Sequence, residues 1–289
     1  MADTPLLECR GVSKAFGAVQ ALYNVDFDVS SGEVMALVGD NGAGKSTLIK
    51  SIAGIYTLDE GELLFEGKPI EIHSPREAAR LGIEIVYQDL ALADNLDVVA
   101  NMFLGRERIQ NGFVLNESSM ERTSRETLDS LHVTTLRSVR QAVAGLSGGQ
   151  RQAVAVAKAV MWNSKLVILD EPTAALGVAQ TRQVLDLVRR LAERGLGVVI
   201  VSHNLNDIFE AADRITVLRL GQRVAVFERA KTTQEEVVHA ITAGALTHAP
   251  GAVDVEVERS GRFERRLTVG GVDARSADAV GARMFAVLA

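Results

Sequence analysis

The sequence predicts an α/β fold built on a parallel β-sheet, and three observations lead to this prediction. Short apolar runs of strand length alternate with segments of helical pattern, which is typical of parallel strands joined by crossover helices. A glycine-rich loop follows the first buried run and opens a helix. The 289 residues, of which 47 % are hydrophobic and 24 % charged, are enough to bury a sizeable core.

The core elements are predicted from apolar runs and from helical periodicity. Continuous apolar runs indicate buried strands, whereas apolar residues three and four positions apart indicate helices. Gly54 and Gly195 follow two of these periodic segments, and each glycine is expected to end its helix. The predicted strands cover residues 32–39, 165–172 and 196–203, and the predicted helices cover 45–54 and 178–194.

The segments around this core differ in character. Residues 6–16 and 62–72 have the pattern of antiparallel strands with turn residues between them. Proline, glycine and strand-like alternation follow residue 245, and 277–289 indicates a short closing helix. The expected domains are 5–245, with a mainly helical insertion at about 89–162, and a C-terminal extension of unknown role at 246–289.

Charge and composition exclude several classes of protein. The net charge of −6 argues against a general nucleic-acid binder, which is usually basic. No run reaches the roughly 18–20 apolar residues that a membrane helix needs, so we expect any action at a membrane to require a partner. The single cysteine, Cys9, cannot form an internal disulfide, which fits a reducing compartment. Arg140 and Arg151 are interpreted as solvated charges.

The loop at 39–47 has the spacing of a phosphate-binding loop, because it fits G-x-x-x-x-G-K-[ST] between a predicted strand and a predicted helix. Glycines let successive amides turn toward a phosphate, and the helix start adds a favourable field. Lys45 is expected to reach the β- and γ-phosphates, and Ser46 to ligate Mg²⁺. The predicted nucleotide-binding residues of this loop are Gly39, Asp40, Asn41, Gly42, Ala43, Gly44, Lys45, Ser46 and Thr47.

Polar residues near the ends of other apolar runs extend this candidate site. Asp170 ends the second buried strand, where ligands bind in open α/β sheets, and is expected to hold Mg²⁺. Glu171 follows and is a candidate for orienting or deprotonating an attacking water. Three further residues allow more than one interpretation. Gln88 ligates Mg²⁺, senses the γ-phosphate or is a surface loop glutamine. His203 contacts a γ-phosphate or caps a strand-to-helix turn, and Phe16 stacks on adenine or lies in the core.

A second glycine-rich helix start lies about a hundred residues after the first. Ser147, Gly148, Gly149 and Gln150 open an apolar helical run, and such a start is a good place to bind a phosphate. Since the chain already has a complete phosphate loop, this second start requires another explanation.

The motifs occur in a specific order. The stretches "GDNGAGKST", "VYQD", "LSGGQRQ", "LVILDEP" and "VSHN" follow one another in a way that resembles the nucleotide-binding subunit of ATP-binding cassette transporters. The resemblance covers about residues 5–245. It implies an α/β P-loop NTPase cassette with a parallel core sheet, an antiparallel β subdomain and a helical subdomain.

The resemblance also implies roles for single residues. Phe16 becomes the aromatic that stacks on adenine, and Gln88 the loop glutamine that joins the core to the helical subdomain. Glu171 becomes the general base of ATP hydrolysis with Mg²⁺, and His203 the γ-phosphate switch. Ser147, with the two glycines after it, becomes half of a site that faces an ATP held by a second copy of the chain or by a close paralogue.

Two segments are similar to one branch of this family. Residues 73–92 and 95–107 resemble importers of the ribose, galactose, xylose and fructose type, in a single-cassette form. This implies an ATPase that powers import of a monosaccharide through a separate permease, at the cytoplasmic face of the membrane, together with an extracytoplasmic sugar-binding protein. The sequence departs from the wider family at Gly177, where an aspartate is usual, and this puts the strength of coupling between two cassettes in doubt.

Two other functions are weighed against transport. A soluble cassette ATPase of translation or DNA repair usually has tandem cassettes or a long coiled-coil insertion, and this sequence has neither. A regulatory cassette that binds ATP without hydrolysis is disfavoured because Glu171 and His203 are present. No nucleic-acid partner is expected.

Overall fold

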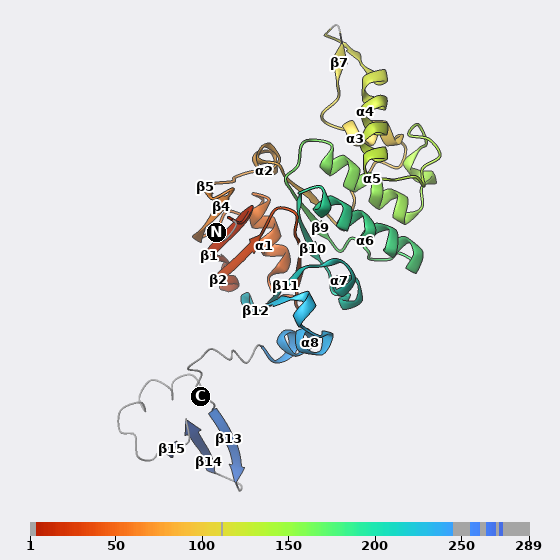
Figure 1. The fold of residues 1–289 in the computed structure, drawn as a ribbon. Coiled ribbons are helices and arrows are strands. Elements are labelled where there is room, and N and C mark those ends of the chain that lie inside the picture. The colour runs from red at the N-terminus through yellow and green to blue at the C-terminus, as the bar shows by residue number, and fades with distance from the viewer. Residues whose placement is uncertain (1–3, 111, 245–254, 261–263, 270–271, 274–289) are drawn as a thin grey trace. The chain divides into compact units, whose positions relative to one another are not determined.

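A six-stranded sheet forms the centre of the chain in the computed structural model, which describes residues 4–110, 112–244, 255–260, 264–269 and 272–273 (Figure 1). The strand order is β12-β11-β3-β10-β9-β6; all neighbours pair in parallel except the antiparallel edge strand β12. The strands are β3 (Val34–Val38), β6 (Ile83–Val86), β9 (Leu166–Asp170), β10 (Gly197–Val201), β11 (Arg214–Arg219) and β12 (Gln222–Glu228).

A second, antiparallel sheet has the order β2-β1-β4-β5. It consists of β1 (Leu7–Phe16), β2 (Val19–Val29), β4 (Glu60–Phe65) and β5 (Lys68–Ile70). The helices are α1 (Lys45–Ile52), α2 (Pro75–Leu81), α3 (Val98–Phe103), α4 (Glu117–Ser130), α5 (Gly148–Val160), α6 (Val178–Glu193), α7 (Leu205–Ala211) and α8 (Gln234–Ala243), with short 3₁₀ turns at Val143–Gly145 and Arg229–Lys231.

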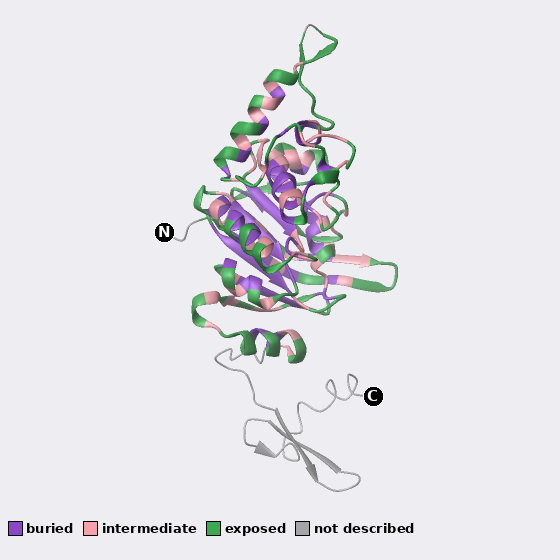
Figure 2. Ribbon diagram, turned by 90° about the vertical axis from the view of Figure 1, so that its right-hand side faces the viewer, coloured by how far each residue is buried: buried purple, intermediate pink, exposed green. Residues whose placement is uncertain are grey.

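Side-chain alternation in the core strands divides the interior in two. Val34, Ala36 and Val38 of β3 belong to a cluster that includes residues of α3 to α8. Met35 and Leu37 point to the other face, where they pack with the antiparallel sheet and with α1. Figure 2 shows these central strands as buried. The parallel sheet is therefore covered on both sides, as expected for continuous apolar strands.

The three predicted strands and two predicted helices are present. The helix α6 buries the apolar face that the sequence indicated, and it ends before Gly195, which has φ +90°. The prediction for residues 89–162 missed a hairpin, β7 (Ile109–Gln110) with β8 (Val114–Leu115). Phe113 at its tip is 95 % exposed. An exposed two-residue strand pair leaves too short an alternation to distinguish from a loop.

The chain divides into two units, Met1–Ala245 and Leu246–Ala289. The second contains an antiparallel sheet of β13 (Val255–Ser260), β14 (Glu264–Val269) and β15 (Val272–Asp273). The helix predicted over 277–289 lies outside the described residues. Within the described residues, no helix is long and apolar enough to cross a membrane.

Candidate functional site

Four parallel strands bring the phosphate loop, Asp170, Glu171, His203 and Gln88 to one edge of the core sheet, whereas Phe16 ends a strand of the other sheet and Ser147 precedes α5. Strands β3, β10, β9 and β6 are consecutive neighbours, so their carboxyl ends lie at the same edge. The glycine-rich loop follows β3, and Glu171 follows β9. His203 and Gln88 each lie two residues beyond the ends of β10 and β6. This edge is where open α/β sheets bind their ligands.

Close backbone approach requires glycine at two positions of the loop. A Cβ atom at Gly39 would lie 2.2 Å from the carbonyl oxygen of Leu218, and a Cβ atom at Gly44 would lie 2.7 Å from that of Ala21. Gly42 faces open space, but its φ of +81° belongs to the left-handed region that glycine adopts without strain. The tight curl of this loop therefore excludes a side chain at Gly39 and at Gly44.

The same curl leaves backbone donors free. Gly44 caps α1 without any side-chain hydrogen bond. In the described part of the chain, the amides of Gly42, Gly44, Lys45 and Ser46 have no hydrogen-bond acceptor. Free amides at a helix start attract an anion through both hydrogen bonding and the helix dipole. The loop can therefore hold a phosphate group.

The ammonium group of Lys45 lies in this loop. Its Nζ donates to the carbonyl oxygens of Gly39 at 2.6 Å and of Asp40 at 3.0 Å. Burial lowers the pKa of Lys45, and the nearby carboxylates of Glu171, Asp40 and Asp170 oppose that shift. A phosphate in the loop would supply the countercharge that the carbonyl oxygens do not.

Two adjacent carboxylates face the loop from the end of β9. Burial, and then the negative charge of Glu171, raise the pKa of Asp170. Glu171 itself has φ +50° and donates its amide to the carbonyl oxygen of Val201 at 2.8 Å. Its Oε1 lies 2.9 Å from Nδ1 of His203, whose side chain is 76 % exposed. Glu171 and His203 therefore form a contact at the open edge of the sheet.

The residues around Asp170 suit Mg²⁺ better than a transition metal. The described residues contain no group of three or more His, Cys, Asp or Glu that could hold a metal ion. Mg²⁺ is usually bound by one or two carboxylates together with substrate phosphates and water. Ser46 lies in the first turn of α1, and Gln88 is exposed in the turn after β6. These oxygens, together with the partly buried carboxylate of Asp170 beside Glu171, fit a hard divalent cation that binds together with a phosphate.

Phe16 ends β1 and is 43 % exposed, which contradicts the core interpretation. Its ring meets that of Tyr56 edge to face, at 5.0 Å between centroids, and Nζ of Lys14 lies 5.6 Å from its centroid. Sequence reasoning missed Tyr56, because a lone tyrosine after a helix has no local pattern that marks it.

The second glycine-rich start is a capped helix. The Ser147 hydroxyl accepts from the amide of Gln150 at 3.3 Å, and Oε1 of Gln150 accepts from the amide of Ser147 at 2.9 Å. A Cβ atom at Gly148 would lie 2.8 Å from Cδ2 of Leu176, and one at Gly149 would lie 3.1 Å from Cβ of Gln180. The glycines therefore have an intramolecular packing role that sequence reasoning missed.

Gly177 caps α6 with φ −76° and ψ +162°. A Cβ atom there would meet nothing within 4 Å, and residues other than glycine adopt extended backbone of this kind at an N-cap. The structure therefore shows no steric requirement for glycine at this position, where an aspartate is usual in the wider family.

Comparison with known proteins identifies the family. A family model described as "ABC transporter" matches residues 22–174. "Fructose import ATP-binding protein FrcA" of Rhizobium meliloti is 49 % identical over 84 % of this chain and 95 % of its own length. The chain belongs to the ABC transporter family. As a member with the cassette fold, it is an ATPase.

Further relatives and solved cassettes agree with this assignment. "Xylose/arabinose import ATP-binding protein XylG" of Sulfolobus acidocaldarius is 49 % identical over 83 % of this chain and 95 % of its own length. "Ribose import ATP-binding protein RbsA 1" of Rubrobacter xylanophilus is 43 % identical over 89 % of the chain, which spans 52 % of that longer relative.

Solved structures show the same cassette fold. The ADP conformation of MJ1267, an ATP-binding cassette of an ABC transporter, has a TM-score of 0.71 at 27 % identity, over 83 % of this chain and 96 % of its own. The dimeric structure of MJ0796, a bacterial ABC transporter cassette, has a TM-score of 0.65 at 25 % identity, over 77 % of this chain and 98 % of its own. These likenesses confirm the predicted α/β P-loop fold.

A groove lies beside the site in this ABC transporter ATPase. It has a volume of about 280 Å³, and residues Glu84 to Val86, Tyr87, Asp89, Leu90 and Ala91 form one wall. Arg106, Lys158 and Trp162 line it from the helical part. Gln88 lies within the segment that forms the first wall, so the groove and the sheet edge share one loop.

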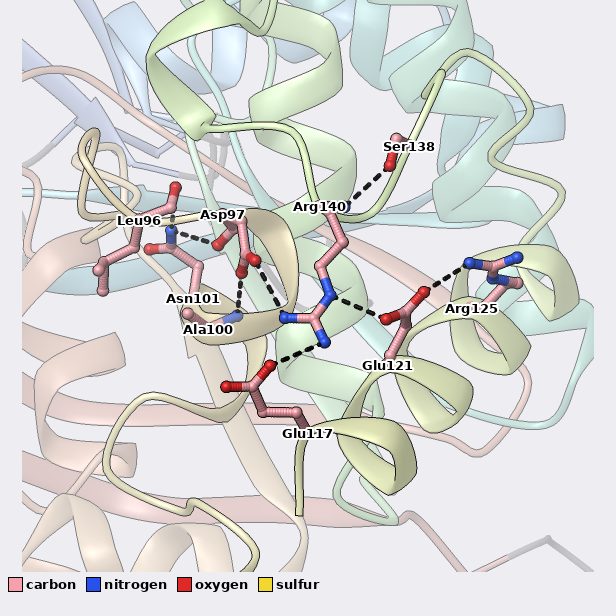
Figure 3. A network of polar contacts seen from close by, with 9 residues as sticks. All are labelled: Leu96, Asp97, Ala100, Asn101, Glu117, Glu121, Arg125, Ser138 and Arg140. Carbon is pink, nitrogen blue, oxygen red and sulfur yellow. Dashed lines mark hydrogen bonds and ion pairs between the residues drawn. The ribbon is translucent and has the colours of Figure 1, made fainter. Parts of the chain in front are cut away.

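Arg140 and Arg151 are accessible to solvent, as interpreted, with side chains 37 % and 31 % exposed, but both also form ion pairs that the sequence did not predict. Arg140 pairs with Asp97 at 3.3 Å, Glu117 at 3.2 Å and Glu121 at 2.8 Å, and it thereby joins α3 to α4 (Figure 3). Arg151 pairs with Asp94 at 2.7 Å. The partners lie far away in sequence, so no local sequence pattern could predict these ion pairs.

Proposed function

We propose that this chain is the ATP-hydrolysing subunit that powers import of a monosaccharide through a separate membrane permease. The single observation that carries the hydrolytic part is the Glu171–His203 contact at 2.9 Å, at the sheet edge that also bears the phosphate loop. The names of the fructose, xylose/arabinose and ribose import relatives support the transport part. In this proposal residues 5–245 are the cassette, and 246–289 are an extension of unknown role.

ATP would bind with its phosphates on the free amides of the loop, with Lys45 at the β- and γ-phosphates. Phe16 would stack on the adenine. Ser46, Asp170 and Gln88 would hold Mg²⁺, which when bound neutralises phosphate charge and orients the triphosphate. The raised pKa of Asp170 supports this role, because a cation beside that carboxylate would offset the unfavourable burial of its charge.

Glu171 would orient the attacking water and accept its proton. The side chain of Glu171 is 17 % exposed, so it is sheltered while still reaching the edge of the sheet. His203 would contact the γ-phosphate, and its exposed ring can leave Glu171 to do so. Glu171 has a left-handed backbone, with φ +50°, which is unfavourable for a residue other than glycine and is common at functional sites.

The signature residues Ser147, Gly148 and Gly149 would bind the γ-phosphate of an ATP held by a second chain. Ser147 already uses its hydroxyl oxygen and its amide in the helix cap, so its hydroxyl proton and the glycine amides are the donors that remain. A set this small suits half of a site rather than a whole one. The dimeric structure of the MJ0796 cassette supports a homodimer, or a dimer with a close paralogue.

The groove beside Gln88 would receive a cytoplasmic helix of the permease. Closure of the dimer would move the helical part and would act on that helix through the shared loop. The chain would then work at the cytoplasmic face of the membrane, and an extracytoplasmic sugar-binding protein would deliver the sugar. Co-purification tests this arrangement: a permease and a sugar-binding protein should accompany the chain, whereas association with ribosomes or DNA would favour the soluble alternative.

The substitution Glu171→Gln tests the assigned base. It should abolish steady-state turnover and trap a dimer that forms only with ATP, because the amide keeps the shape but cannot accept the proton. Size-exclusion chromatography with and without ATP measures the dimer, and phosphate release measures turnover. If the variant hydrolyses ATP at the wild-type rate, Glu171 is not the base. Glu193→Gln, at the end of α6, is a matched control that should behave as wild type.

A further inference from the structure

A buried hydrogen bond lies behind the Glu171–His203 contact. The hydroxyl Oγ1 of Thr173 donates to Oδ2 of Asp207 at 2.5 Å, between residues 34 positions apart. Thr173 is 9 % exposed and Asp207 is 6 % exposed. No other hydrogen bond to the Asp207 carboxylate is present in the described part of the chain. The mechanism proposed above leaves both residues without a role.

The chemistry of this bond makes it a strong one. A hydroxyl that donates to a carboxylate forms a short, charge-assisted hydrogen bond. Burial of a carboxylate is strongly unfavourable unless a donor meets it. Removal of the Thr173 hydroxyl would therefore leave a buried charge without its partner, and the two segments would separate or admit water. The bond holds the turn after β9 against the first turn of α7.

Three ties then join the same two segments. The amide of Glu171 donates to the carbonyl oxygen of Val201 at 2.8 Å. Oε1 of Glu171 meets Nδ1 of His203 at 2.9 Å. The Thr173–Asp207 bond closes the arrangement two residues beyond Glu171 and four beyond His203. The first and third ties are fixed by backbone and burial, and only the middle one is open to solvent.

We propose that Thr173 and Asp207 are positioning residues, which hold the backbones of Glu171 and His203 at the spacing that hydrolysis requires. The exposed ring of His203 can then turn from Glu171 to a γ-phosphate while the distance between their backbones stays constant. Neither residue touches the nucleotide in this proposal. The proposal rests on the proposed roles of Glu171 and His203, and it adds the hydrogen bond that keeps their backbones at a constant spacing.

Two variants break the bond at different costs to stability. Thr173→Val keeps the shape but leaves the carboxylate unpaired, whereas Asp207→Ala removes the charge and leaves only a hydroxyl. Both should lower kcat for ATP about ten- to a hundred-fold and leave KM within about twofold, since the phosphate loop is untouched. Thr173→Ser keeps the hydroxyl and should restore most of kcat. Thr216→Val, which removes a buried hydroxyl from β11, is the matched control and should keep wild-type kcat.

A second background separates positioning from general damage. In a His203→Ala chain, Thr173→Val should lower the residual turnover by less than threefold, because the pair it positions is already broken. A full further loss in that background, or a kcat that follows Tm across the variants, would overturn the proposal. If Glu171→Gln abolishes turnover while Thr173→Val and Asp207→Ala keep wild-type kcat, the positioning role alone is wrong. If Glu171→Gln is fully active, the proposed function fails first.

Discussion

The chain has two glycine-rich helix starts that look alike in sequence and differ in structure. The first, at α1, is capped by Gly44 with no side chain, and its amides are free. The second, at α5, is capped by Ser147 and Gln150 through a reciprocal pair of hydrogen bonds. A start that satisfies part of its own donors has fewer left for a ligand.

The two helix starts also require glycine for different physical reasons. Gly39 and Gly44 are required by backbone atoms that a Cβ would strike and by left-handed φ values. Gly148 and Gly149 lack left-handed φ values and lie against the side chains of Leu176 and Gln180. The first start is therefore rigid by backbone geometry, and the second depends on its neighbour. Five predictions test this contrast, from the largest expected effect to the smallest.

Lys45→Ala should break the first start. Loss of the ammonium group removes the only side-chain cation within the loop, so ATP affinity should fall at least about a hundredfold, on the scale of a charge-assisted contact to phosphate. Turnover should disappear with it. Titration with a fluorescent ATP analogue measures the affinity, and Lys68→Ala, in the exposed strand β5, is the control. Unchanged affinity in Lys45→Ala would place the phosphates elsewhere.

Ser147→Arg should break the second start without affecting the first. ATP binding by the monomer should stay near normal, while dimer formation and hydrolysis are lost. Loss of the helix cap alone costs about 1 kcal/mol. Thr233→Arg removes an equivalent cap at α8, so it is a control for that cost and should leave hydrolysis unchanged.

A mixture of the two variants tests directly whether two chains share one ATP site. Chains with Lys45→Ala and chains with Ser147→Arg should each be inactive, but a mixed dimer has one site with an intact loop and an intact signature. The mixture should therefore recover a measurable part of wild-type turnover. An inactive mixture of folded chains would count against a site shared between two chains.

Gly148→Ala should disturb the second start more mildly. The new Cβ would lie 2.8 Å from Cδ2 of Leu176, a side-chain end that can shift. We expect Tm to fall by about 2–4 °C, which corresponds to about 1 kcal/mol at this size, and turnover to fall several-fold. The double variant Gly148→Ala with Leu176→Ala should recover Tm if this contact is the cause. If Tm does not recover, a contact other than the one with Leu176 requires glycine at position 148.

Asp170→Asn probes the charge that faces the first start. The pKa of Asp170 is raised in the folded chain by burial and by Glu171, so the folded state holds this proton more tightly than the unfolded state. Stability is therefore lost as the pH rises through the pKa, and the ionised carboxylate is unfavourable at neutral pH. Without nucleotide, Asp170→Asn should raise Tm by about 1–3 °C at pH 8.

The gain from Asp170→Asn should shrink as the pH is lowered toward that pKa. Thermal melts at pH 8 and pH 5 measure it, and Asp186→Asn on the exposed face of α6 should show no such gain. A gain that is equal at both pH values would not come from this carboxylate.

Gly177→Asp should have the smallest effect. The position is open and extended, and aspartate is only a few tenths of a kcal/mol better than glycine as an N-cap. Tm should rise by no more than about 1 °C. A large loss of stability would show that the segment after Pro172 tolerates no side chain here.

Much of this molecule was predictable from local pattern. The phosphate loop, the strand that ends at Asp170, the buried face of α6 and the capped start at Ser147 each depend on residues a few positions apart. Such features follow from backbone geometry and from periodic burial, which neighbouring residues determine.

Other features were decided only by the tertiary structure. The packing of Gly148 on Leu176, the three ion pairs of Arg140 and the Thr173–Asp207 bond all join segments that are distant in sequence. The register of parallel strands and the packing of helices set those contacts, and no short stretch of residues determines either of them. The sequence by itself therefore determined which groups could bind a phosphate, and the fold decided which of them lie together and what holds them there.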